Sequence, residues 1–358
     1  MDGVRRESLD PVPPVDPSAW SEVVECVGQA GSVVLVLHVR PDGDSVGCSI
    51  ALARGLRALG KTARVACSDP VPANLAFLDP DGDCQPPERV TGSLDLGLFV
   101  DCADLERAGS ARALLNRVGT LVNVDHHPSN SRFGQINYID PRAAACGEIA
   151  YALLRELGAP IDARAATALY AALVTDTGSF RFENTSARTL ALAAALVECG
   201  ADAALVGREV WSSRSLASLR LLQSALGTLG LAAGGSIAWM SLTPSMLRRA
   251  GATPNDGEGL VDYARALRGV EVALFFTLER PGLVRVNLRS RSTVDVSRLA
   301  AGFGGGGHAR AAGCSVRGSL RAVREDVLAA AHRALGVPGG APGGEGLVPC
   351  TQRGDPLP

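Results

Sequence analysis

Asp125, His126 and His127 stand in a row directly after an apolar run at residues 119–124. The chain has only five histidines, so two neighbours at the end of an expected buried strand draw attention to chemistry. Imidazole nitrogens and carboxylate oxygens bind divalent cations, and a histidine can also transfer a proton. Adjacent residues point in different directions, so one histidine could bind a metal while the other faces a substrate. A purely structural histidine pair is the alternative.

A second apolar run, at residues 33–37, leads into His38, and Asp42 and Asp44 follow closely. We expect the two carboxylates in a loop between this strand and a helix that begins near residue 46, where they share a small volume with the imidazole. Carboxylates crowded in this way repel one another, and a divalent cation relieves the repulsion. The alternative is an Asx turn that caps the helix and binds no ligand.

Two further carboxylates end apolar segments. Asp101 follows a strand expected at residues 96–100, and Asp176 follows a helix expected at residues 163–174. Alone, Asp101 could be a helix cap and Asp176 a turn residue. Ligands bind at the carboxyl ends of the strands in parallel α/β sheets, so the separate segments together predict one shared site.

The candidate metal ligands are His38, Asp42, Asp44, Asp101, His126 and Asp176, with Asp125 and His127 beside them. Four carboxylates roughly neutralise two divalent cations. Oxygen and imidazole ligands without thiolate favour manganese or magnesium, and the mixed set favours manganese. Two cations about 3.5–4 Å apart can polarise a phosphoryl group and stabilise a leaving oxygen. The predicted reaction is phosphoester hydrolysis.

A second group of residues lies far along the chain, with Arg289 directly after a strand expected at 283–288 and a glycine run that ends at His308. The backbone amides of Gly305, Gly306 and Gly307 could approach an anion closely, and Arg289 and His308 could add charge and hydrogen bonds. We therefore expect these residues to bind the distal phosphate or nucleoside of a substrate. A flexible turn is the alternative for the glycine run.

Apolar runs alternate with helical patterns in the first half of the chain, which predicts βαβ units and a parallel sheet. We expect strands at 33–37 and 62–66 and at the runs that end at 100 and 124, with helices at 46–59, 148–157, 163–174, 186–198 and 215–229. A second α/β part follows, with strands at 237–242, 270–278 and 283–288 and helices at 244–250, 260–268 and 320–335. The predicted fold is α/β, with a helical linker between the two domains and the active site in the cleft between them.

The predicted domain limits follow from these patterns and from the Pro- and Gly-rich ends. They are a flexible arm at 1–17, a catalytic domain at 18–212, a linker helix at 213–230, a substrate-binding domain at 231–337 and a disordered tail at 338–358.

Composition restricts the class of protein. The chain has 358 residues and a formal net charge of −2, which argues against broad capture of long nucleic acid and favours a small substrate. No apolar run approaches the roughly 20 residues that cross a bilayer, and no apolar signal segment follows the first residues, so we expect a cytoplasmic protein with no membrane partner. The nine cysteines are scattered singly, as expected for reduced core thiols.

Taken together, the motifs at 38–44, 101, 125–127 and 176 and the Gly305-Gly306-Gly307-His308 run resemble the DHH phosphoesterase superfamily, in its branch with a C-terminal DHHA1 domain. The resemblance covers residues 18 to 337. Within the superfamily the chain is most similar to the oligoribonuclease and pAp phosphatase group, the nanoRNases, whose relatives include cyclic di-AMP phosphodiesterases. One departure is the stretch 143–148, which lacks the more usual Ser/Thr residues.

The resemblance implies roles for the individual residues. His38, Asp42 and Asp101 would hold one metal, and Asp44, Asp101, His126 and Asp176 the other, with Asp101 as the bridge. Asp125 would orient its neighbours, and His127 would contact the scissile phosphate and assist protonation of the leaving group. Arg289, Gly305, Gly306, Gly307 and His308 would bind substrate, and a homodimer is expected.

The function that the resemblance implies is a manganese-dependent phosphodiesterase that cuts very short RNAs to mononucleotides and converts adenosine 3′,5′-bisphosphate (pAp) to AMP. Cyclic di-AMP hydrolysis is the alternative within the same chemistry. Inorganic pyrophosphatase is disfavoured by the glycine run, and a processive exonuclease by the lack of room for an OB-fold. A non-catalytic nucleotide sensor is expected only where metal ligands are missing.

Overall fold

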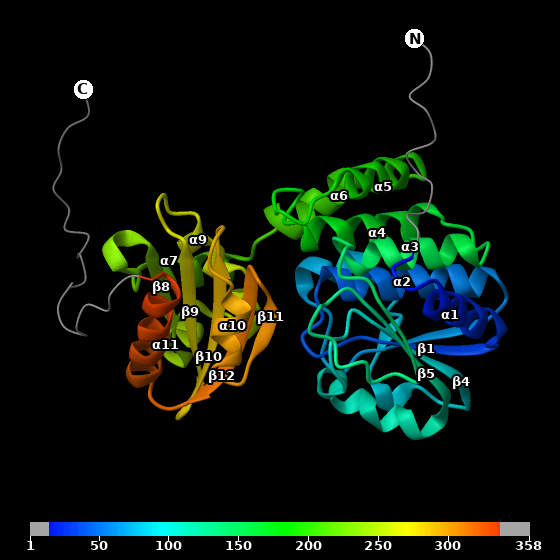
Figure 1. Cartoon of the computed structure of the whole chain (residues 1–358), viewed down its shortest axis with the longest axis horizontal. Coiled ribbons are helices and arrows are strands. Elements are labelled where there is room, and N and C mark those ends of the chain that lie inside the picture. The colour runs from blue at the N-terminus through cyan, green and yellow to red at the C-terminus, as the bar shows by residue number, and fades with distance from the viewer. Residues whose placement is uncertain (1–13, 337–358) are drawn as a thin grey trace, which may run out of the picture. The chain divides into compact units, whose positions relative to one another are not determined.

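The computed structural model describes residues 14–336 as two compact units that divide between Ser213 and Arg214 (Figure 1). The predicted arm, apart from residues 14–17, and the predicted tail lie outside the described residues.

The first unit contains a sheet whose paired strands are all parallel, in the order β3-β2-β1-β4-β5-β6. The strands are β1 (Ser32–Val36), β2 (Thr62–Ala66), β3 (Cys84–Gln85), β4 (Leu94–Val100), β5 (Val118–Asp125) and β6 (Ile136–Ile139). Strand β1 lies beside β2 on one side and beside β4 on the other, so the connections leave it in opposite directions. In sheets of this kind the ligand-binding crevice lies at the carboxyl ends of the strands at this switch point.

Both faces of this sheet are covered. Its helices are α1 (Pro17–Gln29), α2 (Gly43–Ala58), α3 (Cys146–Glu156), α4 (Ala163–Asp176), α5 (Ala187–Glu198) and α6 (Ala203–Gly207), with shorter helical turns η2 (Ala73–Leu78), η3 (Pro87–Arg89), η4 (Leu105–Arg117) and η5 (Arg208–Ser212). Residues from α1 to α6 share one apolar core with one face of the sheet, and η4 packs on the opposite face. Helices α2 and α4 pack closely, because a Cβ at Gly47 would lie 2.3 Å from the Ala168 carbonyl oxygen.

The second unit has a mixed sheet in the order β11-β12-β10-β9-β8-β7. Its strands are β7 (Gly230–Ala232), β8 (Ile237–Leu242), β9 (Val272–Arg280), β10 (Leu283–Ser290), β11 (Gly306–His308) and β12 (Ala311–Arg317). Strands β8 and β9 are parallel, whereas β7–β8, β9–β10, β10–β12 and β11–β12 are antiparallel pairs. Alternate residues of β10 are buried, as expected for a strand with unlike faces.

Helices cover both faces of this second sheet. They are α7 (Leu216–Leu226), α8 (Pro244–Ala250), α9 (Leu260–Arg265), α10 (Val296–Ala301) and α11 (Leu320–Ala334), with turns η6 (Ala233–Gly235) and η7 (Pro254–Gly257). One apolar core joins α10 and α11 to the sheet, and another joins α7, α8 and α9 to its other face.

The predicted α/β class, with a parallel sheet first and a second α/β part after it, is confirmed. Strands β2 and β8 have the predicted limits. Several short elements were not predicted because they lack a long apolar run, and Gly313 also interrupts β12. They are β3, β6, β7, β11, β12, α6 and α10.

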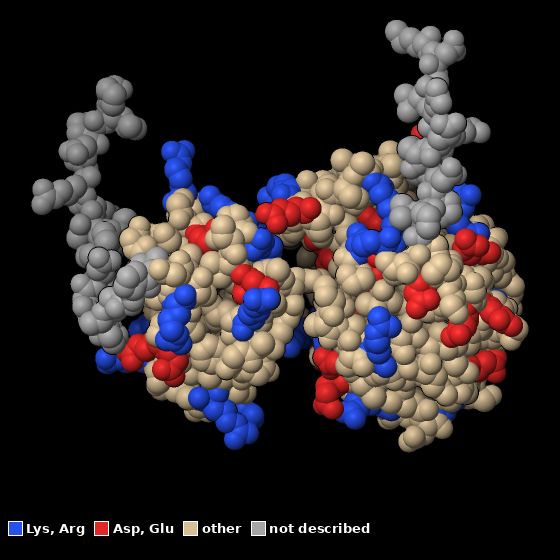
Figure 2. Space-filling model, viewed as in Figure 1, with Lys and Arg blue, Asp and Glu red and all other residues tan. Residues whose placement is uncertain are grey.

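Charge and hydropathy also bear on the class of protein. Acidic and basic side chains are interspersed over the visible face of each unit (Figure 2). No single helix of the described residues has the length and apolarity to span a membrane, and α5 passes this test only together with the segment at 203–212, across a bend of 119°.

Candidate active site

Asp101, at the end of β4, lies at the centre of the polar cluster. Its backbone has a φ of 60°, an uncommon conformation for a residue other than glycine, and its amide donates to the Val124 carbonyl on the next strand. The carboxylate is 2% exposed. Its Oδ2 lies 3.4 Å from His38 Nε2, and its Oδ1 lies 3.6 Å from His126 Nε2. One carboxylate therefore faces two imidazoles with its two oxygens.

His38 follows β1 with its ring held by the backbone. Its Nδ1 lies 2.9 Å from the Val39 carbonyl oxygen and 3.1 Å from Arg107 Nη2. When Nδ1 donates to Val39, Nε2 keeps its lone pair for a cation. This Nε2 is buried without a hydrogen-bond partner among the described residues, and it lies 3.6 Å from Asp42 Oδ2.

Asp42 and Asp44 occupy different positions from those expected, because α2 begins at Gly43 and not near residue 46. The prediction that both carboxylates lie in the loop is wrong for Asp44, which is buried in the first turn of the helix. Asp42 is the helix N-cap and accepts from the Ser45 amide at 3.0 Å, so it caps the helix and also faces His38. The capping alternative and the cluster are therefore compatible.

Asp44 is fixed by the start of another helix. Its carboxylate oxygens accept from the backbone amides of Cys146 at 2.6 Å and Gly147 at 3.0 Å, the first two residues of α3. Its Oδ2 also lies 3.9 Å from His126 Nε2. Free amides at a helix N-terminus stabilise a negative charge, which explains how a buried carboxylate is tolerated here.

His126 faces three carboxylates. Its Nδ1 donates to the Ala143 carbonyl at 3.1 Å, which directs Nε2 toward Asp176 Oδ2 at 3.3 Å and toward Asp101 and Asp44. Asp176 is the last residue of α4, which extends two residues beyond the helix predicted at 163–174. The stretch 143–148, which departs from the usual pattern, thus contributes to this cluster through its backbone.

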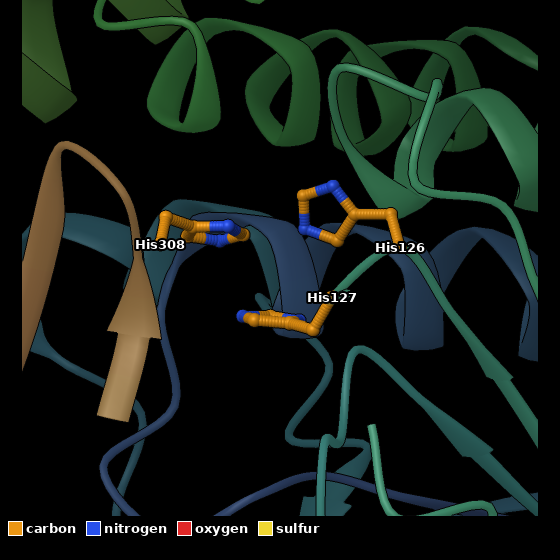
Figure 3. Close-up of side chains that lie close together, drawn as sticks. All are labelled: His126, His127 and His308. Carbon is orange, nitrogen blue, oxygen red and sulfur yellow. The ribbon is translucent and has the colours of Figure 1, made fainter. Parts of the chain in front are cut away.

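His127 follows His126 but has a different environment. The two rings are inclined by 77°. Figure 3 shows both side chains at the end of β5. His127 Nδ1 lies 2.8 Å from Asp125 Oδ1, and Asp125 Oδ2 accepts from Asn130 Nδ2 at 2.6 Å. Asp125 therefore orients the His127 ring, and Asn130 in turn orients Asp125.

The electrostatics of His38 reflect the same crowding. Burial alone would lower the pKa of His38, but Asp42 and Asp101 outweigh burial and raise it to about 10. For Asp101, burial raises the pKa, and the neighbouring His126 and His38 reverse the direction and hold it well below its usual value.

The pKa values of two other carboxylates, Asp44 and Asp176, shift in the opposite direction. Burial, together with Asp101 and Asp176, raises the pKa of Asp44 well above its usual value. Burial also raises the pKa of Asp176 to about 7; His126 opposes this shift and Asp101 adds to it. Acids that retain protons and imidazoles that gain them are the signature of a site with excess negative charge, which cations would neutralise.

The donor set fits two divalent cations. Atoms bound to one cation at about 2.1 Å stand roughly 3 Å or slightly more apart. The Nε2 atom of His38 lies 3.4 and 3.6 Å from its carboxylate oxygens, and that of His126 lies 3.3 to 3.9 Å from its own, so both sets of distances are near this value. The distances above 3.5 Å are too long for hydrogen bonds. The donors around His38 and those around His126 form two such groups, and Asp101 belongs to both.

Three residues near the cluster were not among the predicted site residues. The amide of Asn130 also donates to Asn123 Oδ1 at 2.8 Å, and both asparagines donate to the Cys102 carbonyl. Asn123 interrupts the apolar run of β5, which is the one signal that could have pointed to this network. The third is Cys146, whose buried Sγ lies 3.9 Å from Asp101 Oδ1 and 3.7 Å from Asp125 Oδ1.

In the second unit, the strand register brings Arg289 and His308 into one row. Arg289 on β10 pairs with Ala311 on β12, and Ala311 pairs with His308 on β11, the residue that Figure 3 labels on this strand. Residues directly opposite one another project from the same face of a sheet, so both side chains lie on one face, on either side of the small Ala311. Arg289 Nε also lies 4.0 Å from Asp262 Oδ1 of α9.

The backbone around the glycine run explains why glycine is needed at two of its positions, Gly305 and Gly307. The Gly305 amide donates to the Ala300 carbonyl at 2.9 Å, so it completes the end of α10 and is already engaged. A Cβ at Gly305 would lie 2.2 Å from the Gly313 carbonyl oxygen, and one at Gly307, where φ is 137°, would lie 2.5 Å from that of Ala311. Gly305 and Gly307 are thus required by the close approach of β11 to β12, whereas a Cβ at Gly306 would have no neighbour within 4 Å. Gly306 and Gly307 pair with β12, so this part of the run is a strand.

Comparison with known proteins places the chain in a family. The model of the DHH family, N-terminal domain, matches residues 32–173, and the model of the DHHA1 domain matches residues 236–336. A bifunctional oligoribonuclease and PAP phosphatase NrnA from Thermus thermophilus is 33% identical over 322 residues, which cover 87% of this chain and 94% of that relative. The chain belongs to the DHH family and carries a DHHA1 domain. The predicted family is confirmed.

Other relatives agree. A bifunctional oligoribonuclease and PAP phosphatase NrnA from Bacillus subtilis is 27% identical over 300 residues, or 83% of this chain and 93% of that relative. A crystal structure of an exopolyphosphatase-related protein from Bacteroides fragilis has a TM-score of 0.80 at 24% identity and covers 91% of this chain and 97% of that one. This structure supports the DHH fold.

Proposed function

We propose that this DHH-family chain is a metal-dependent phosphoesterase that hydrolyses very short oligoribonucleotides to mononucleotides and dephosphorylates pAp to AMP. The observation that carries the proposal is Asp101, whose two carboxylate oxygens face His38 and His126. The name shared by the relatives from Thermus thermophilus and Bacillus subtilis supports the substrate class.

His38, Asp42 and Asp101 would hold one divalent cation, and Asp44, Asp101, His126 and Asp176 the other, with manganese as the expected metal. Bound cations of this kind polarise a phosphoryl group and supply a hydroxide nucleophile near neutral pH. The chain holds these donors in place without the cations, through the backbone contacts of Asp101 and His38 and the helix amides that bind Asp44.

His127 would donate a proton to the leaving oxygen. Its Nδ1 is oriented by Asp125, which leaves Nε2 as the atom that exchanges a proton with substrate. Asn130 keeps Asp125 in the required orientation.

Arg289 and His308 would bind a second phosphate or the nucleoside of the substrate. Their common row on the second sheet gives a charged group and an imidazole on the same face. A guanidinium binds phosphate with two parallel hydrogen bonds, which suits a ligand with a terminal phosphate such as pAp.

The test is turnover of pApA, pAp and cyclic di-AMP by the full chain in Mn²⁺, with Asp101→Asn as the variant. We expect pApA and pAp to be hydrolysed faster than cyclic di-AMP, and Asp101→Asn to reduce both rates by a factor on the order of 10³ or more. Asp202→Asn is the matched control, since Asp202 is an exposed helix cap far along the sequence from the cluster.

Turnover of pApA by Asp101→Asn at the wild-type rate would overturn the assignment of the site. If cyclic di-AMP were hydrolysed faster than the linear dinucleotide, the phosphoesterase assignment would remain and the proposed substrate would be wrong.

A further inference from the structure

Cys146 places a thiol in the polar cluster of the first unit. Its backbone amide and that of Gly147 donate to the two oxygens of Asp44, which fixes the first turn of α3 against this carboxylate. With the turn held in this position, the Cys146 side chain is fully buried and its Sγ faces Asp101 Oδ1 at 3.9 Å. The thiol is therefore a neighbour of the same oxygen that faces His126.

Four potential ligand atoms meet at this point. One atom each from Asp44, Asp101, His126 and Cys146 lies within 4.8 Å of every other, and all four residues are buried. One sulfur, one nitrogen and two oxygens are a donor set that suits a tetrahedral thiophilic cation such as Zn²⁺. Bonds of about 2.3 Å to sulfur and 2.0–2.1 Å to nitrogen place such ligands roughly 3.5 Å apart, so contraction by about 1 Å closes the set.

A second observation indicates that a cation belongs beside this group. His38 Nε2 is buried without a hydrogen-bond partner among the described residues and lies 3.4 Å from Asp101 Oδ2. The carboxylate that faces the thiol with one oxygen thus faces this buried nitrogen with the other.

We propose that Cys146 is a conditional fourth ligand, which leaves hard cations to the oxygen and imidazole donors but binds a thiophilic divalent cation together with Asp44, Asp101 and His126. On binding, the sulfur–hydrogen bond breaks, the proton leaves to solvent and a sulfur–metal bond forms. The site would accordingly favour Zn²⁺ or Co²⁺ over Mn²⁺ more strongly than the same site without the thiol. This inference rests on the proposed two-cation site.

Cys48 provides a matched comparison. Its buried Sγ donates to Asp44 Oδ1 at 3.2 Å, so it is a second thiol beside the cluster, but it does not belong to the four-atom group. Cys48→Ala therefore removes a thiol of similar burial without removing the proposed ligand.

The experiment loads the full chain with Co²⁺ and records the near-ultraviolet absorption from sulfur-to-cobalt charge transfer. Wild type and Cys48→Ala are expected to show the band, and Cys146→Ala and Cys146→Ser to lack it. In competition titrations, the preference for Zn²⁺ over Mn²⁺ should fall by about tenfold or more in both Cys146 variants. Mn²⁺ stoichiometry, measured in parallel, should be unchanged in Cys146→Ser.

The outcomes separate the two proposals. Absence of the band in Co²⁺-loaded wild type, its persistence in Cys146→Ser, or loss of Mn²⁺ binding in Cys146→Ser would each overturn the role of the thiol. Failure of wild type itself to bind Mn²⁺ would instead overturn the proposed two-cation site.

Discussion

Two carboxylates, Asp176 in the first unit and Glu271 in the second, show how differently the two units treat negative charge. Burial raises the pKa of Asp176 to about 7, and its close charged neighbours include other acids. Burial also acts to raise the pKa of Glu271, but backbone amides and the Ser292 hydroxyl reverse the direction and lower it to about 2. Its oxygens accept from the amides of Ser292, Thr293 and Val294.

The difference separates a structural charge from a functional one. Glu271 is satisfied by the chain itself, so its energy does not depend on any ligand. Asp176 belongs to a group that is complete only when a cation is present. Changes in the first unit should therefore alter chemistry and cation binding, whereas changes in the second should alter substrate affinity or local stability.

Among the variants that keep every proposed cation ligand, His127→Ala in the first unit should have the largest effect. Removing the proposed proton donor should lower kcat for pApA by a factor on the order of 10²–10⁴ while cation stoichiometry is retained. Steady-state kinetics together with Mn²⁺ titration would measure both. His332→Ala, on α11 of the second unit, is the control histidine; equal losses in the two variants would refute the assignment.

Arg289→Ala in the second unit should act on affinity. Loss of a charged hydrogen bond to phosphate should raise KM for pAp by roughly 10- to 100-fold and leave Mn²⁺ binding unchanged. Arg285→Ala is the matched control, since Arg285 lies on the same strand and the same face, four residues away. A fall in kcat without a rise in KM would mean that the second unit contributes to chemistry, which breaks the comparison.

Metal-free protein should reveal the unsatisfied charge of Asp176. Because its folded-state pKa of about 7 exceeds the ordinary 3.8, the folded state binds more protons, and the free energy of unfolding falls as pH rises from about 4 to 7. Asp176→Asn lacks this titration. Without metal, the free energy of unfolding of the variant relative to that of wild type should therefore increase by on the order of 2 kcal/mol between pH 4 and pH 8.

Denaturant titrations in chelator at the two pH values measure this gain. In saturating Mn²⁺ the order should reverse, because the variant lacks a ligand. If the free energy of unfolding had the same pH dependence in both proteins, the pKa of Asp176 would not be raised in the folded state.

The smallest effect is expected for Glu271→Gln, which should destabilise the second unit by about 1 kcal/mol with or without Mn²⁺. The depressed pKa stabilises the fold above about pH 4.5, and the difference between wild type and variant should close as pH falls toward 2. Hydrogen exchange of the amides at 292–294 reports this locally. A Mn²⁺-dependent difference would contradict the contrast with Asp176.

Much of the first unit could be predicted because its candidate metal ligands follow long apolar runs in the sequence. Strands β1, β4 and β5 were expected where they occur, and parallel strands deliver the residues that follow them to one edge. What the pattern could not provide was the position of Cys146, because the contact between its amide and Asp44 joins residues 102 apart in sequence.

The second unit was harder for a related reason. The row of Arg289, Ala311 and His308 depends on β12, whose Ala- and Gly-rich start carries little strand pattern. The sequence indicated both charged residues but not their register, since cross-strand pairing is set by tertiary packing.

The central claim, that Asp101 is shared by two cations, is tested most directly by electron paramagnetic resonance of the Mn²⁺-loaded chain. Wild type should bind two Mn²⁺ per chain with a spin-coupled spectrum, and His38→Ala should retain one uncoupled Mn²⁺. A single Mn²⁺ in wild type, or two without spin coupling, would contradict the account.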